Sequence, residues 1–112
     1  MITGAHVMIF TQDEEADRAF LRDVLEIPCI DSGGGWLIFK LPPADLGVHG
    51  GERNDHHELY LICDDLDAAI AKLTGKGVVP GEIMHASWGR ATSIPLPGGG
   101  KIGLYEAHHA RP

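Results

Sequence analysis

Two short stretches of the chain, residues 6–10 and residues 58–63, alternate their side chains with the period of two that is typical of a β-strand. A cluster of acidic residues follows each stretch, where a helix is expected to begin. Each half of the chain then closes on another strand pattern with a glycine at its centre, Gly47 in the first half and Gly103 in the second. The pattern predicts one supersecondary unit used twice, each copy too small to bury a core alone.

Each half is predicted to follow the order β-α-β-β-β. In the first half, the capping-box sequence Thr11–Glu14 predicts the start of a helix, and Pro28 prevents that helix from continuing. In the second half, a helix from about Leu66 to Thr74 is expected to end near Gly75. The remaining strands are expected around Cys29–Ile30, Trp36–Leu41, Asp45–His49, Val78–Val79, Glu82–His85, Arg90–Pro95 and Lys101–Glu106.

The composition of the chain mainly excludes classes of partner and location. The formal charge of −7 argues against a nucleic-acid partner, and a hydrophobic fraction of 44% is ordinary for a globular protein. No apolar run approaches the roughly 20 residues that span a bilayer, and no signal-peptide pattern is visible. Cys29 and Cys63 have no metal-ligand spacing and are expected to be reduced. We therefore expect a cytoplasmic protein of one domain, residues 1–112, with no membrane partner.

Several stretches of this pattern match a known family. They are His6–Phe10 with Ala19–Phe20 and Val24–Leu25, then Cys63–Ala69, then Pro97–Ile102. The chain resembles the vicinal oxygen chelate superfamily, which includes glyoxalase I, bleomycin-resistance and fosfomycin-resistance proteins and extradiol dioxygenases. The resemblance implies an α+β fold in which two β-α-β-β-β modules, about residues 1–50 and 56–108, form a curled mixed sheet. This sheet would be a cup with helices on its convex side, and the resemblance also implies a homodimer.

The strand phases predict which side chains line the cup. Apolar positions are assigned to the helix-covered side: Val7, Ile9, Leu46, Val48, Leu59, Leu61, Cys63, Ile102 and Leu104. The opposite, concave side then receives His6, Met8, Phe10, Gly47, His49, Glu58, Tyr60, Ile62, Lys101, Gly103 and Tyr105. Trp36 or Phe39 is expected to add an aromatic wall.

The resemblance also implies where a metal would bind. Metal-using relatives take ligands from four strand positions, which correspond here to His6, Gly47, Glu58 and Gly103. Because glycine offers no side-chain ligand, the usual site cannot form. His49 lies two residues beyond Gly47, on the same face and about 7 Å further along. His6, His49 and Glu58 would then form a two-histidine, one-carboxylate set suited to Fe²⁺, Mn²⁺, Ni²⁺ or Zn²⁺.

With such a metal, the favoured function is a glyoxalase-like or dioxygenase-like enzyme that acts on a small molecule. It would be a metal-dependent lyase or an extradiol-type dioxygenase, with Glu58 as a catalytic group and Tyr60 or Tyr105 as proton donor. The simpler alternative is that His6 and Glu58 pair with each other or with a ligand, while His49 lies in solvent.

A metal-free function is the competing hypothesis. Glycines at the floor of the cup make room for a flat ligand, and nearby aromatic side chains can stack on a planar or cationic group. The expected ligand contacts are Phe10, Trp36, Trp88, Arg90, Gly47 and Gly103, with Glu58 as the well-placed charge. This mode resembles sequestration by bleomycin-resistance proteins. A member without a catalytic role is a third possibility, since the two glycines would also relieve crowding between curled strands.

Overall fold

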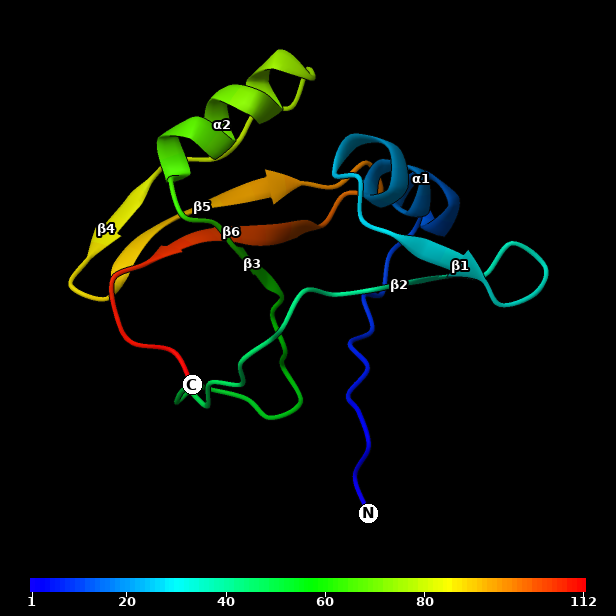
Figure 1. Cartoon of the computed structure of the whole chain (residues 1–112), viewed down its shortest axis with the longest axis horizontal. Coiled ribbons are helices and arrows are strands. Elements are labelled where there is room, and N and C mark those ends of the chain that lie inside the picture. The colour runs from blue at the N-terminus through cyan, green and yellow to red at the C-terminus, as the bar shows by residue number, and fades with distance from the viewer.

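The computed structural model describes residues 1–112 and has an α+β fold, as predicted. Figure 1 shows α2 and α1 on one side of a sheet, and the N-terminal residues running away from it. None of the helices combines the length and the apolar character that a membrane-spanning helix needs. In chain order the elements are α1 (Glu14–Ala19), the π-helix η1 (Phe20–Val24), β1 (Cys29–Asp31), β2 (Leu37–Phe39), β3 (Tyr60–Ile62), α2 (Leu66–Gly75), β4 (Met84–Ala86), β5 (Gly89–Pro95) and β6 (Lys101–Ala107).

The second half of the chain forms the predicted β-α-β-β-β unit. Its four strands lie in the order β3-β6-β5-β4, with β3 parallel to β6 and the other pairs antiparallel. The first and last strands are therefore neighbours, and Tyr60 is aligned with Gly103. The strand predicted at residues 78–79 does not form, because Val78 instead packs into the core directly after α2.

The core lies between this sheet and the helices. Its buried side chains are Leu66, Leu73, Val78, Ile94, Leu96, Ile102 and Leu104. Leu59, Leu61 and Cys63 pack against it from β3 and its ends. The predicted phase of β3 and β6 is thus confirmed. Burying each leucine or isoleucine side chain in this core stabilises the fold by about 1.5–3 kcal/mol.

The first helix begins as predicted but changes its form after Ala19. The Asp13 side chain accepts a hydrogen bond of 3.0 Å from the N–H of Ala16, which satisfies one of the free donors of the first turn. From residue 20 to residue 24 the helix continues with π-type turns, and Glu26 then has a φ of 56°. Phe20, Leu21, Val24 and Leu25 pack against the core of the second half.

The remainder of the first half differs from the prediction. Only β1 and β2 pair. The segments predicted as strands at residues 6–10 and 45–49 make no backbone hydrogen bonds, and their apolar side chains Val7, Ile9, Leu46 and Val48 are exposed rather than helix-covered. The chain has 43 backbone–backbone hydrogen bonds, whereas a compact chain of this length forms about 75. These two predictions are wrong for the single chain, because no neighbouring strand completes either ladder.

Candidate functional site

Aromatic side chains gather on the sheet face that the helices leave open. The Tyr105 ring lies at their centre, with its centroid 6.3 Å from that of Tyr60 and 5.4 Å from that of Trp88. Both pairs meet edge to face, an arrangement that aromatic quadrupoles favour. His109 lies 5.7 Å from Tyr105 on the side of the C-terminal tail. We call Tyr60, Trp88, Tyr105 and His109 the aromatic cluster.

Sheet geometry brings these rings together. Tyr60 is aligned with Gly103 across the β3–β6 pair, and Tyr105 follows two residues later on the same face of β6. A Cβ atom at Gly103 would overlap the Tyr60 ring, lying 2.6 Å from its Cγ atom. The absence of a side chain at Gly103 therefore makes room for the Tyr60 ring. The space that the sequence assigned to a ligand is filled by the protein itself.

Hydrogen bonds hold Trp88 at the turn between β4 and β5. The Tyr105 hydroxyl donates to the Trp88 carbonyl oxygen over 3.1 Å, and the His108 N–H donates to the same oxygen over 2.8 Å. The next residue, Gly89, has a φ of 153° and lies so close to Glu106 that a side chain there would collide. The indole is held against Tyr105 and is 40% exposed, so one part of its surface remains free.

One carboxylate borders the cluster. The Tyr60 hydroxyl donates to Glu58 over 2.9 Å, and His56 Nε2 lies 3.3 Å from the other oxygen. The hydrogen bond from Tyr60, followed by that from His56, lowers the pKa of Glu58. Burial, followed by the bond to Glu58, raises the pKa of Tyr60. Acid–base catalysis at neutral pH needs pKa values near 7, and both shifts move away from it. The arrangement suits a fixed negative charge better than proton transfer.

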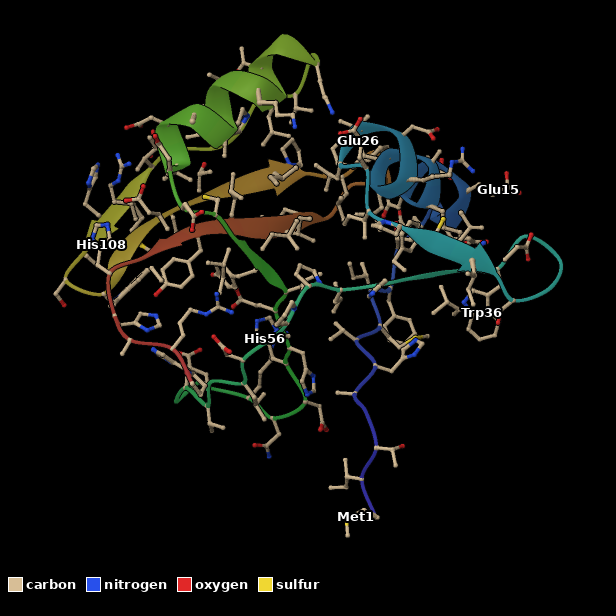
Figure 2. All side chains as sticks on the ribbon, viewed as in Figure 1. Met1, Glu15, Glu26, Trp36, His56 and His108 are labelled. Carbon is tan, nitrogen blue, oxygen red and sulfur yellow. The ribbon has the colours of Figure 1, made fainter.

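Other predicted ligand contacts lie elsewhere. Arg90 points to the helix-covered side, where its guanidinium contacts Glu106 at 3.1 Å and Asp67 of α2 at 3.2 Å. Phe10 is 90% exposed on the N-terminal segment, and Gly47 has open space around it. Trp36 lies at the β1–β2 hairpin, well apart from His108 in Figure 2. The structure therefore unites Glu58, Tyr60, Trp88, Gly103 and Tyr105 of the predicted site, and separates the rest.

The predicted metal ligands are not assembled. No group of three or more His, Cys, Asp or Glu side chains in the chain has positions that could hold a metal ion. His49 Nδ1 lies 2.6 Å from the carbonyl oxygen of Gly50, within hydrogen-bonding distance. Glu58 is in hydrogen-bonding contact with Tyr60 and His56. His6 lies on the unpaired N-terminal segment. These donors do not fit a shared metal site within one chain.

Two residues of the site were missed by the sequence analysis. The sequence analysis gave no role to His56 or His109, yet His56 contacts Glu58 and His109 lies beside Tyr105. A single histidine outside a strand follows no hydrophobic periodicity, so the sequence does not distinguish either residue from an ordinary surface histidine. The orientation of Arg90 did have a signal: Arg90 and Ile94 lie four residues apart on one strand, so they share a face. Since Ile94 is a core residue, Arg90 had to point toward the helices.

With this geometry in hand, solved structures are informative. One is TnmS3, described as an antibiotic-binding protein from Streptomyces sp. CB03234, with a TM-score of 0.65 and 24% identity over 96% of this chain and 99% of that one. A lactoylglutathione lyase from Agrobacterium tumefaciens gives a TM-score of 0.66 and 15% identity over 92% of both chains. A glyoxalase/bleomycin resistance protein, also from Streptomyces sp. CB03234, gives 0.59 and 25% identity over 85% and 92%.

These likenesses define the fold. The chain has the vicinal oxygen chelate fold, shared with the glyoxalase/bleomycin resistance/dioxygenase superfamily, as the sequence resemblance implied. No protein-family model matches the sequence, and no curated protein matches it either.

Proposed function

We propose that this protein is a metal-free small-molecule-binding protein that holds a planar, cationic ligand against the aromatic cluster. The observation that carries the proposal is the contact of a carboxylate with half-exposed rings on the open sheet face. Tyr60 and Trp88 are 45% and 40% exposed, so each offers a free surface to a ligand. Each cation–π contact contributes about 0.5–2 kcal/mol, and the Glu58 carboxylate adds electrostatic attraction.

The charge of the site favours a cation. Because the pKa of Glu58 is lowered, this carboxylate is ionised at neutral pH, and the chain as a whole carries a charge of −7. A ligand with a positive, delocalised ring system would satisfy both the rings and the carboxylate. The printed description of TnmS3 as antibiotic-binding supports a binding role within the same fold. The metal-dependent lyase or dioxygenase receives no support from the donor positions, and we do not propose it.

Trp88 fluorescence provides a direct test. Trp36→Phe leaves Trp88 as the only tryptophan, and Trp88→Phe leaves only Trp36, which is similarly exposed at 51%. Proflavine, a planar cation, should quench the Trp88 signal saturably and bind measurably by calorimetry. Glu58→Gln or Tyr105→Leu should weaken binding about tenfold, equivalent to about 1.4 kcal/mol. Equal quenching of Trp36 and Trp88, or affinity that is unchanged in Glu58→Gln and Tyr105→Leu, would contradict the proposal.

We also infer that the working form is a homodimer. The chain exposes 8543 Å², whereas a compact protein of 12.0 kDa exposes about 6,000 Å². The excess of about 2,500 Å² exceeds the roughly 800 Å² that each partner buries in a standard interface. The radius of gyration of 14.8 Å is likewise larger than the value of about 13 Å for a compact chain.

A further inference from the structure

We propose that the C-terminal tail, residues 109–112, occupies the ligand site of the free protein and must leave it before a ligand can bind. The proposal rests on the planar, cationic ligand proposed above, and it names how that same site is regulated. Three features support it: the tail lies against the aromatic cluster, side chains alone hold it there, and those side chains have the chemistry expected of the ligand.

The tail starts from a fixed point beside Trp88. The His108 N–H donates to the Trp88 carbonyl oxygen over 2.8 Å, and His108 Nε2 lies 2.7 Å from a carboxylate oxygen of Glu106. From there the chain turns back on the side of the sheet away from α2 (Figure 1). The His109 ring then lies 5.7 Å from the Tyr105 ring, within the range of about 4.5–7 Å over which aromatic rings interact. A ligand placed against Tyr105 on this side would need the space that the imidazole fills.

One ion pair holds the far end of the tail. Arg111 Nε donates to the Asp45 carboxylate over 2.6 Å, and a second guanidinium nitrogen donates to the Pro43 carbonyl oxygen over 3.4 Å. Both side chains of the pair are partly exposed, and ion pairs of this kind contribute little to stability. Residues 109–112 make no backbone–backbone hydrogen bond. The tail can therefore leave the sheet without breaking the backbone hydrogen bonds of the fold.

The tail carries the chemistry that the site is expected to select. Imidazole is a flat ring that packs on aromatic side chains, and guanidinium is a planar cation that pairs with carboxylates. A planar, cationic ligand would thus replace contacts that the protein already makes with itself through His109 and Arg111. Tail and ligand then compete for one surface. The measured affinity is the intrinsic affinity reduced by the fraction of molecules whose tail is released.

Competition gives Asp45 an effect opposite to that of its charge. If Asp45 only contributed to the negative potential of the protein, Asp45→Asn would weaken the binding of a cation. Because Asp45 holds Arg111, Asp45→Asn should instead release the tail and strengthen binding. His109 gives a similar contrast. His109→Ala should strengthen binding if the imidazole is a competitor, and weaken it if the imidazole is a wall of the ligand site.

Calorimetric titration of proflavine into the full chain measures these signs. Asp45→Asn, Arg111→Gln and His109→Ala should each lower the dissociation constant about threefold to fivefold, as the loss of one exposed ion pair or ring contact allows. Asp45→Asn combined with Arg111→Gln should match the single variants, because either change opens the same ion pair. Arg22→Gln is the control. It removes the same charge and an exposed ion pair of 2.7 Å with Asp23 on η1, and should leave the affinity unchanged.

Nuclear magnetic resonance gives an independent measurement of the tail. The Tyr105 ring should shift the signals of the His109 ring protons, and Asp45→Asn or saturating proflavine should move them toward those of an unstructured histidine. Absence of proflavine binding in the wild type and in all variants would overturn the proposed ligand site, and the tail proposal with it. Binding whose affinity is unchanged or lowered in either Asp45→Asn or His109→Ala would overturn the tail proposal alone, as would His109 signals that proflavine does not move.

Discussion

Replacing Asp17 with alanine tests how the first helix is held to the second half of the protein. Asp17 is 5% exposed, and its Oδ1 atom accepts a hydrogen bond of 2.7 Å from the Gly98 N–H. This bond joins α1 to the loop that precedes β6, across 81 residues of sequence. Its other carboxylate oxygen is buried without a partner.

The expected loss follows from these contacts. Removing a charged acceptor from a partly buried N–H costs about 3 kcal/mol, and removing the unpartnered oxygen returns about 1 kcal/mol. Asp17→Ala should therefore lower the free energy of unfolding by about 2 kcal/mol. For a chain of about 100 residues this corresponds to a fall in melting temperature of roughly 8 °C. Asp17→Asn keeps an acceptor for Gly98 and should cost about 1 kcal/mol.

Urea unfolding at one fixed protein concentration is the appropriate assay, because a dimer makes the midpoint depend on concentration. Asp17 also lies in the first turn of α1, where negative charge is favoured by the helix dipole. Glu14→Ala controls for that effect, since Glu14 is in the same turn but exposed. The reasoning would be refuted if Asp17→Ala cost no more than Glu14→Ala, or lay within about 0.5 kcal/mol of the wild type.

Three further predictions concern the site and its surroundings. Gly103→Ala should lower the free energy of unfolding by about 1–3 kcal/mol, because the new Cβ overlaps the Tyr60 ring. Gly47→Ala is the control, since a Cβ there meets nothing within 4 Å and should leave the stability unchanged. Equal urea midpoints for the two variants would contradict this. Hydrogen bonds from Arg90, Leu66 and His108 lower the pKa of Glu106 from 4.5 to about 2, so their stabilising effect is present above pH 4.5 and is lost as the pH falls toward 2. In Glu106→Gln the urea midpoint should therefore depend less on pH between 4.5 and 2 than in the wild type. The same dependence of the midpoint on pH in both proteins would argue against this role of Glu106. Fe²⁺, Mn²⁺, Ni²⁺ and Zn²⁺ should not raise the melting temperature, and a saturable rise that His6→Ala abolishes would restore the metal site predicted from sequence.

The sequence predicted the second half of the fold well because its signals were redundant. In β6, Ile102 and Leu104 alternate with polar or small residues, and α2 begins at an N-cap, Asp65, whose side chain accepts from the Ala68 N–H over 3.1 Å. Each of these features points to one phase and one boundary. The π-helical turns after Ala19 had no such marker, since apolar residues at 20, 21, 24 and 25 fit either helix type.

The predicted site residues that come together lie on or next to strands that pair within the chain. Tyr60 and Tyr105 come together because β3 and β6 pair within the chain, and Glu58, two residues before β3, is bonded to the Tyr60 hydroxyl. His6 and His49 lie on segments that have no partner strand. The alternation of side chains predicted on which face of a strand each histidine lies, but not which residues lie beside it. Alternation describes one strand at a time, and the choice of partner depends on contacts that are distant in sequence or that lie in another copy.

The position of β6 has a consequence for the order in which the protein can form. β6 is the last element of the chain, yet it lies between β3 and β5 and supplies two core side chains. The loop just before it also provides the Gly98 N–H that Asp17 binds.

During synthesis the N-terminal residues emerge first. The β1–β2 and β4–β5 pairs can form before β6 is made, but β3 has no neighbour in its sheet other than β6. A chain cut before Lys101 should therefore be unable to form the four-stranded sheet.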